Sequence, residues 1–233
     1  LEATNPCGEQ WLHDGDVCNL GSVNLAKFVK EGKVDEEGLR YATKMAVRML
    51  DNVIDLTDFP VAKVNTTFRN NRRVGLGIMG FADMLIKLGI AYDSEKGLET
   101  GEEVMRFISK EASIASSNLA AKRGNFPAWK DSIYHKKSRY FKGCHIPLRN
   151  ATKTTIAPTG TISIIADTSS GIEPLFALSY ARKTAEGNVL VYFNDDLKKA
   201  LKENNLYNDE IIDKIHKEGT IENIDQIPNK IKK

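Results

Sequence analysis

A cysteine lies among turn-forming residues near the start of the chain, in the stretch NPCGE at residues 5–9. Asn, Pro and Gly favour turns, so the sequence predicts that Cys7 stands at the tip of a loop. A loop cysteine can act as a thiolate nucleophile, a metal ligand, a redox thiol or a radical carrier. Because Glu9 disfavours a nearby thiolate, the pair is more compatible with a neutral thiol that carries a hydrogen atom, with Glu9 as a general base.

Two other roles for Cys7 find less support in the sequence. His13 is the nearest candidate base, but it lies in the polar stretch LHDGD and is expected on a surface loop. A zinc site could draw on Cys7, Cys18, Cys144 and His145, but the usual C-x2–4-C spacing is absent and adjacent residues rarely bind one ion together. We therefore expect no metal site, and we expect Cys144 to be a buried or incidental thiol.

A second cluster, APTGTIS, contains Thr159, Gly160, Thr161, Ile162 and Ser163. Hydroxyls and free backbone N–H groups at a helix start suit a phosphate, although a capped helix start explains the same pattern. The cluster is not a Walker A loop, because the closing Lys-Ser/Thr is missing.

A third cluster, SSGIEPLF, places Glu173 before a proline in a serine- and glycine-rich turn. The sequence favours neither of two interpretations of this cluster, an ordinary connecting loop or a segment with a chemical role.

The glycines of RRVGLGIMGFADML match the pattern G-x-G-x-x-G at Gly75, Gly77 and Gly80. A dinucleotide site needs a preceding strand, and NTTFRNNRR is a poor one. A buried strand or close-packed turn over Val74–Met79 is the better interpretation.

Periodicity predicts alternating strands and helices, which is typical of an α/β fold. Residues 16–29 are expected to form a strand or a short buried segment, interrupted by Gly21. Further strands are expected at 74–79, 154–157 and 176–180, with a turn into a short helix or another strand at 158–163. The expected helices are one between an Asp35 cap and Pro60, then 81–88, 94–123, 194–204 and 208–218. The first helix shows a predicted core face of Leu39, Ala42, Met45, Ala46, Met49, Val53 and Leu56.

Composition excludes several classes of protein. Of 233 residues, 41% are hydrophobic, yet no apolar run approaches the ~20 residues that cross a membrane. The net charge of +2 is too balanced for a nucleic-acid surface, so the basic stretches RNNRR and HKKSRY are interpreted as solvated faces. Three irregularly spaced cysteines make no disulfide framework and fit a reducing cytoplasm. The absence of an initiator methionine suggests a fragment of a longer polypeptide.

Four motifs in order, NPCGE, CNLGSVNL, RRVGLGIMGFADML and TTIAPTGTISIIADTSSGIEPLFALSY, resemble the large catalytic chain of ribonucleotide reductase. They cover most of residues 3–182, and their residues are most similar to those of the adenosylcobalamin-dependent class. By this resemblance, Cys7 becomes a thiyl radical that abstracts the 3′ hydrogen of the ribose, and Glu9 takes the 3′-hydroxyl proton. Asn5 orients the ribose hydroxyls, and Cys18 is one member of a redox cysteine pair. Residues Thr159 to Ser163 hold the substrate phosphates.

The resemblance also implies a fold, namely a ten-stranded α/β barrel with the radical cysteine on a central finger loop. The chain is similar to the second half of that barrel, as a single domain over 1–233 with a barrel core at 1–182 and a peripheral helical segment at 183–233. The partner of Cys18, the effector sites and the dimer contact are then expected upstream.

The implied activity is reduction of ribonucleotides, and the family favours diphosphates as the substrates. The resemblance further implies a cytoplasmic homodimer with a thioredoxin- or glutaredoxin-like reductant and no nucleic acid or membrane partner. The fragment alone is expected to be inactive and to self-associate or need its missing half. Two alternatives stay open. A glycyl-radical relative would need a glycyl loop, which the tail EGTIENIDQIPNK does not resemble. A non-catalytic nucleotide-binding or assembly module would tolerate loss of Cys7.

Overall fold

The computed structural model describes residues 1–183 and 189–232. The strands are β1 (Ala3–Thr4), β2 (Trp11–Leu12), β3 (Cys18–Asn24), β4 (Val29–Lys30), β5 (Lys33–Val34), β6 (Arg73–Met79), β7 (Ser179–Lys183) and β8 (Val189–Phe193). The α-helices are α1 (Glu36–Leu56), α2 (Ala62–Asn71), α3 (Phe81–Leu88), α4 (Glu95–Arg123), α5 (Gly160–Ile165), α6 (Asp195–Glu203), α7 (Asp209–Glu218) and α8 (Asn229–Lys232). Two short 3-10 helices are η1 (Leu25–Phe28) and η2 (Pro127–Asp131).

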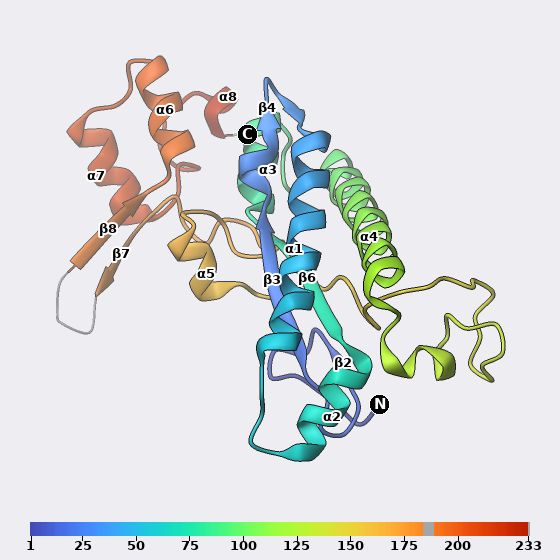
Figure 1. The fold of residues 1–233 in the computed structure, drawn as a ribbon. Helices are drawn as coiled ribbons and strands as arrows, with labels where there is room; N and C mark the ends of the chain where they lie inside the picture. The colour runs from blue at the N-terminus through green and yellow to red at the C-terminus, as the bar shows by residue number, and fades with distance from the viewer. Residues whose placement is uncertain (184–188, 233) are drawn as a thin grey trace.

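A parallel pair of strands, β3 and β6, forms the centre of the molecule (Figure 1). Every residue of β6 is buried, as expected for a strand covered on both faces. On its other side β6 meets an extended segment, where Leu76 forms a parallel bridge with Thr154. The α/β class is therefore confirmed. Within the described residues β3 pairs with β6 alone, so these strands do not close a barrel.

Helix α1 runs alongside β3 and β6, packs against both strands and lies beside α4 (Figure 1). As predicted, Asp35 caps it, with Oδ1 accepting a hydrogen bond from Gly38 N at 3.0 Å. The predicted core face is largely wrong. Met45, Met49 and Leu56 are 40%, 66% and 85% exposed, while the buried apolar residues of α1 are Leu39, Val47, Leu50 and Ile54. Helix α1 thus carries apolar side chains on two faces, and periodicity alone could not tell which one meets the sheet.

A buried carboxylate, Asp51 on α1, forms hydrogen bonds and ion pairs with the end of α2, the end of α4 and residues 149–150. Its Oδ1 accepts hydrogen bonds from Arg72 Nε at 3.0 Å, from Arg72 Nη2 at 2.9 Å and from Asn150 Nδ2 at 3.0 Å. Its Oδ2 accepts from Arg123 Nη1 at 3.2 Å and lies 3.5 Å from Arg149 Nε. The Asp51 side chain is fully buried, so these donors replace all of its water.

Several predicted boundaries differ from the structure. Strand β3 runs through Gly21 without interruption. The predicted strand at 154–157 makes only the single bridge at Thr154. Of the two alternatives for 158–163, the turn into a short helix is confirmed, as helix α5, and the strand is not. The predicted strand at 176–180 begins only at Ser179, because Phe176 is 96% exposed in a loop that has no neighbouring strand to pair with.

The C-terminal part has its own small core, separate from that of β3 and β6. The predicted helices at 194–204 and 208–218 are confirmed as α6 and α7, and the antiparallel hairpin β7–β8 precedes them. The predicted boundary at residue 183 falls beside residues 184–188, which lie outside the described residues.

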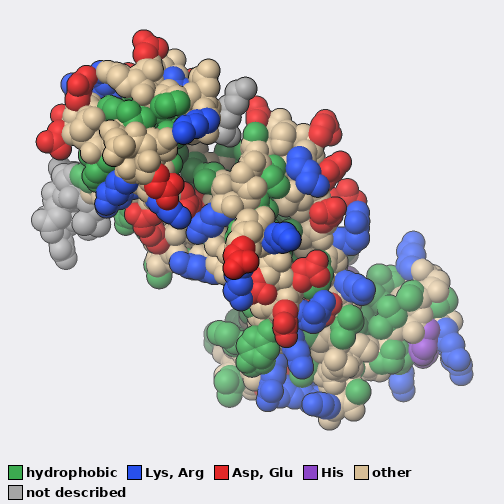
Figure 2. Space-filling view, turned by 90° about the horizontal axis from the view of Figure 1, so that it is seen from above, with side chains coloured by type: hydrophobic (Ala, Val, Ile, Leu, Met, Phe, Trp, Pro, Cys, Tyr) green, Lys and Arg blue, Asp and Glu red, His purple; other side chains and the backbone are tan. Residues whose placement is uncertain are grey.

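One end of the molecule is a basic, loop-rich projection formed by residues 124–150 (Figures 1 and 2). The basic stretch at 135–140 lies here, with Lys136, Lys137 and Arg139 exposed, as expected for a solvated face. The same expectation for RNNRR at 69–73 is wrong for its last two residues, because Arg72 and Arg73 are buried in ion pairs with Asp51 and Asp16. No helix among residues 1–183 and 189–232 is long and apolar enough to span a membrane.

Candidate functional site

The loop that carries Cys7 is the tip of a small hairpin between β1 and β2. Ala3 pairs with Leu12 and Thr4 with Trp11, so residues 5–10 form the connection, which we call the finger loop. Gly8 N donates to Asn5 O at 3.0 Å, and Gly8 adopts φ +83°, which favours glycine. Cys7 is exposed, in agreement with the expectation that turn residues present it at a loop tip.

Asn5 holds the finger loop closed at its base. Its Oδ1 accepts a hydrogen bond from Gln10 N at 3.0 Å, and its backbone N donates to Gln10 O at 3.2 Å. The side-chain oxygen is therefore engaged within the loop. Its Nδ2 makes no hydrogen bond among the described residues, so this amide group is the part of Asn5 that can reach a ligand.

Glu9 brings a carboxylate-bearing side chain to the cavity that Cys7 also lines. Its Oε2 atom is buried and finds no hydrogen-bond partner within the described part of the chain. The side chain borders a cavity of about 330 Å³ whose lining includes Cys7, Glu9, Ile156, Pro158, Ile172 and Glu173. An unpartnered buried carboxylate oxygen is costly unless a ligand supplies a donor, so this cavity suits a hydroxyl-bearing molecule.

Cys18 lies at the start of β3, opposite Arg73 of β6. Burial is the main cause that raises the pKa of its thiol to about 12, against a lowering by Thr152 and by the charge of Arg73. Arg73 is itself held by the buried Asp16, with Nε donating to Oδ2 at 2.6 Å. Cys18 is therefore a protonated thiol at neutral pH.

The predicted phosphate turn leads into the short helix α5. Thr159 adopts φ +56°, and its Oγ1 accepts a hydrogen bond from Gly171 N at 2.7 Å. Ser163 Oγ pairs with Ser170 Oγ at 2.9 Å. The hydroxyls of Thr159 and Ser163 are thus used within the fold, whereas Gly160, Thr161 and Ile162 are exposed. The first N–H groups of a helix have no intrahelical partner, so they remain available to an anion.

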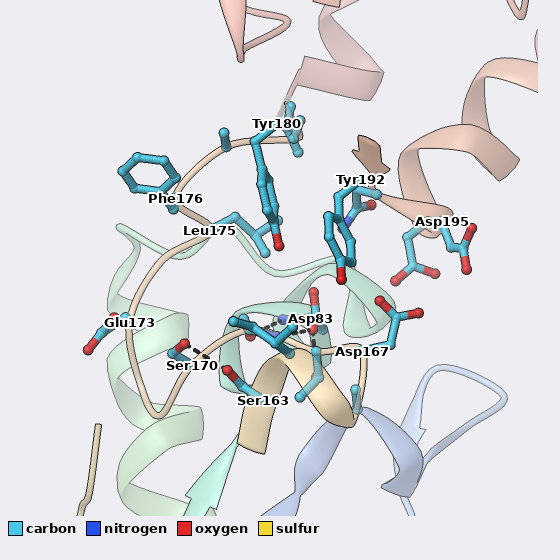
Figure 3. Close-up of a pocket in the computed structure, with 18 of the residues that line it drawn as sticks. Asp83, Ser163, Asp167, Ser170, Glu173, Leu175, Phe176, Tyr180, Tyr192 and Asp195 are labelled. Carbon is cyan, nitrogen blue, oxygen red and sulfur yellow. Dashed lines mark hydrogen bonds between the residues drawn. The ribbon is translucent and has the colours of Figure 1, made fainter. Parts of the chain in front are cut away.

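A second cavity, of about 470 Å³, lies between α5 and the C-terminal part. Figure 3 shows the rings of Tyr180 and Tyr192 side by side above α5, stacked with centroids 4.9 Å apart. Below them, Asp83 Oδ2 accepts hydrogen bonds from Thr168 Oγ1 and from Ser169 N, both at 2.7 Å. Asp83 therefore fixes the loop that follows α5. Glu173 borders both cavities from an exposed loop.

The remaining sequence expectations divide as follows. Cys144 is exposed, so the buried alternative for it is wrong. His13 is exposed, as predicted. Among the described residues no cluster of His, Cys, Asp or Glu could hold a metal ion.

The glycines of the G-x-G-x-x-G pattern do not form a phosphate-binding turn. Gly75 and Gly77 lie inside β6, where a side chain would collide with neighbours. A methyl group on Gly75 would lie 2.7 Å from Leu20 Cδ2, 3.0 Å from Thr155 Cγ2 and 3.2 Å from Cys18 Sγ. Close packing of β3 and the 152–158 segment on β6 explains these glycines.

The sequence did not single out Thr155 or Asp83, which both position the site. Thr155 Oγ1 donates to the carbonyl oxygen of Glu9 at 3.1 Å, across 146 positions of sequence. The available signal for Asp83 was a carboxylate flanked by the apolar residues of FADMLI, and the structure shows that it is buried.

Comparisons with known proteins agree on one family. The chain matches the ribonucleotide reductase barrel domain over residues 1–233. It is 47% identical over 234 residues to the vitamin B12-dependent ribonucleoside-diphosphate reductase of Thermoplasma acidophilum, with 100% of this chain and 29% of that protein covered. It is 40% identical over 232 residues to the reductase of the same name from Mycobacterium tuberculosis, with 100% and 32% covered.

A solved structure is also similar, the class Id ribonucleotide reductase alpha subunit of Actinobacillus ureae. The TM-score is 0.76 at 26% identity, and the similarity covers 99% of this chain and 41% of that one. The chain thus spans about a third or less of the length of the two curated reductases that it matches.

Proposed function

Because the chain belongs to the ribonucleotide reductase family, we propose that it carries the radical-bearing part of an enzyme that reduces ribonucleotides to deoxyribonucleotides. One observation carries the proposal. Cys7, which is exposed, and Glu9, whose Oε2 atom is buried and has no hydrogen-bond partner among the described residues, line the same cavity. A ribose offers what this pair needs, namely a C–H bond for a thiyl radical and a hydroxyl for the carboxylate.

In the proposed reaction the Cys7 thiyl radical removes the 3′ hydrogen of the ribose. Glu9 Oε2 accepts the 3′-hydroxyl proton, which would satisfy the oxygen that lacks a partner, while a thiol of the redox cysteine pair gives its proton to the 2′-hydroxyl, which leaves as water. Asn5 orients the ribose hydroxyls through Nδ2, because its Oδ1 already accepts a hydrogen bond from Gln10 N.

Cys18 supplies reducing electrons as one member of a cysteine pair that becomes a disulfide. Its protonated state suits this role, because a neutral thiol can donate a hydrogen atom. The only other cysteines of this chain are Cys7 and Cys144. We assign the partner of Cys18 to the remainder of the enzyme. A thioredoxin- or glutaredoxin-like reductant would then reduce the disulfide of this pair back to two thiols.

The substrate phosphates are assigned to the turn from Thr159 to Ser163. The exposed residues 160–162 would contribute backbone N–H groups, while the hydroxyls of Thr159 and Ser163 shape the turn. The names of the curated relatives favour a diphosphate substrate.

The names of those relatives also favour adenosylcobalamin as the cofactor. When bound, it supplies the radical chemistry that starts turnover. The residues present fit such a source at Cys7, whose exposed thiol is open to an external radical. We assign the chain no contacts with the corrin. The whole enzyme is proposed to be a cytoplasmic homodimer whose catalytic barrel has ten strands, this chain forming the second half.

The test is a reconstitution assay with the full-length polypeptide that contains this chain. It is mixed with adenosylcobalamin, a dithiol and each ribonucleotide, and deoxyribonucleotide is quantified. We expect cobalamin-dependent product that disappears in Cys7→Ala, with substrate affinity nearly unchanged because the thiol acts in the chemical step. Cys144→Ala, which removes the other exposed thiol, is the matched control and should retain activity.

Product without cobalamin would move the protein to another reductase class. Absence of product, or full activity in Cys7→Ala, would refute the proposed reaction and favour a nucleotide-binding or assembly module. The 233-residue chain alone is expected to make no product.

A further inference from the structure

The finger loop is attached to the sheet by one hydrogen bond. Within residues 5–10 the polar contacts are internal, from Gly8 N to Asn5 O and between Asn5 and Gln10. Among the hydrogen bonds of the described residues, only that from Thr155 Oγ1 to Glu9 O joins this loop to a residue outside its own hairpin. Thr155 therefore sets where the Glu9 backbone lies.

Thr155 is itself held firmly in place. Its side chain is almost fully buried, and its backbone N donates to Leu76 O at 3.1 Å. Two glycines of β6 let it lie close to the strand. A methyl group on Gly75 would lie 3.0 Å from Thr155 Cγ2, and one on Gly77 would lie 3.0 Å from Thr155 O. The hydroxyl thus projects from a position with little room to shift.

The same position brings the two reactive parts of the site together. Cys18 Sγ and Thr155 Cγ2 both pack over the bare backbone of Gly75, within 3.2 Å of where its side chain would begin. The charge of Glu9 reaches the Cys18 thiol and contributes to its raised pKa. The finger loop and the redox cysteine therefore share one support.

We propose that Thr155 is a positioning residue that, through its hydrogen bond to the Glu9 carbonyl, holds the finger loop and its Cys7 and Glu9 in register with the cavity and with Cys18. The inference rests on the proposed function for its catalytic consequence. The contact itself does not depend on that function. Thr155 touches no reacting atom, so its loss changes the placement of the catalytic groups and not their chemistry.

Three variants of the full-length enzyme separate the hydroxyl from the bulk of the side chain. Thr155→Val keeps the shape and loses the donor, whereas Thr155→Ser keeps the donor. Thr100→Val is the matched control, because Thr100 is equally buried but its Oγ1 donates to Lys96 O within α4. Thr155→Ala replaces Thr155→Val if circular dichroism shows that the valine variant is not folded.

Two readouts are measured, steady-state kinetics and hydrogen exchange of the Gly8 and Gln10 amides without substrate. For Thr155→Val we expect kcat to fall by about ten- to a hundredfold, because small misplacements of reacting groups are costly. KM should stay within about twofold, since the phosphate turn is untouched. Loop exchange should rise about fivefold, the effect of losing one ordinary hydrogen bond. Thr155→Ser and Thr100→Val should resemble the wild type.

Equal effects in Thr155→Val and Thr100→Val, or an equally impaired Thr155→Ser, would overturn the proposal. So would unchanged loop exchange in Thr155→Val. If the wild-type enzyme makes no deoxyribonucleotide, the proposed function fails, and the exchange data alone decide the contact. Faster exchange in Thr155→Val than in Thr155→Ser then supports it, and equal exchange refutes it.

Discussion

Replacing Asp51 by Asn should strongly destabilise the protein. The carboxylate is fully buried, and it accepts hydrogen bonds from Arg72, Arg123 and Asn150 with Arg149 close by. Asn has nearly the same shape but no charge, and its NH2 group would face donors in place of an acceptor. The substitution therefore removes the one buried negative charge that these guanidinium groups share.

The expected magnitude follows from these contacts. Removing one partner of a buried ion pair costs about 3–5 kcal/mol. Arg72 keeps a second acceptor, because its Nη1 lies 2.7 Å from Asp55 Oδ1, and Arg123 is partly exposed. We therefore expect the lower end, about 3 kcal/mol. Because the urea m-value increases with protein size, the fall in the unfolding midpoint should equal this free energy divided by the m-value measured for the full-length protein.

Urea unfolding of the full-length protein measures this effect, with equal m-values as the condition for comparison. Asp58→Asn is the control, because Asp58 pairs with Arg69 at 2.8 Å but its side chain is 83% exposed. Exposed pairs contribute about 0–1 kcal/mol, so the control should shift the midpoint little. A midpoint for Asp51→Asn no lower than that of Asp58→Asn would refute the reasoning.

Three further predictions follow from the same structure. Burial alone would raise the pKa of Asp55, but the hydrogen bond and charge of Arg72 outweigh it and hold that pKa below its usual range. The stabilisation from ionised Asp55 is thus complete above about pH 4 and is lost as the pH falls through the lower pKa of the folded state. The urea midpoints of the wild type and Asp55→Asn should therefore converge on acidification. A gap between the two midpoints that does not change with pH would contradict this. Iodoacetamide at pH 8 should modify the exposed Cys144 well before Cys18, whose buried thiol has a pKa of about 12, and equal rates by mass spectrometry would show that Cys18 is accessible as a thiolate. Gly75→Ala should cost about 1–3 kcal/mol in urea unfolding by overpacking, whereas Ala at the open position Gly160 should not, and equal effects would argue against the close packing over Gly75.

The sequence predicted local structure well where local signals decide it. Asp35 begins α1, and turn residues present Cys7 at a loop tip, because caps and turns depend on a few neighbouring residues. The motifs that resemble the reductase family also identified the family correctly. Their residue roles stay proposals.

What the sequence could not supply depends on contacts between distant segments. The apolar face of α1 that meets the sheet was misjudged, because Met45 and Met49 follow helical spacing as well as Val47 and Leu50 do. The bond between Thr155 and Glu9 spans 146 positions, so no local pattern could reveal it.

The contacts of Asp51 also constrain the order in which the chain can fold during synthesis. Its partner Asn150 leaves the ribosome 99 residues later, which is a delay of about 5–20 s at ordinary rates of translation. Until then the carboxylate lacks two of its four partner side chains and is better solvated by water than buried. Helix α1 can form early, since helices are local, but its docking on β3 and β6 must wait for residues 149 and 150. The nascent chain therefore keeps this sheet open until residue 150 has emerged.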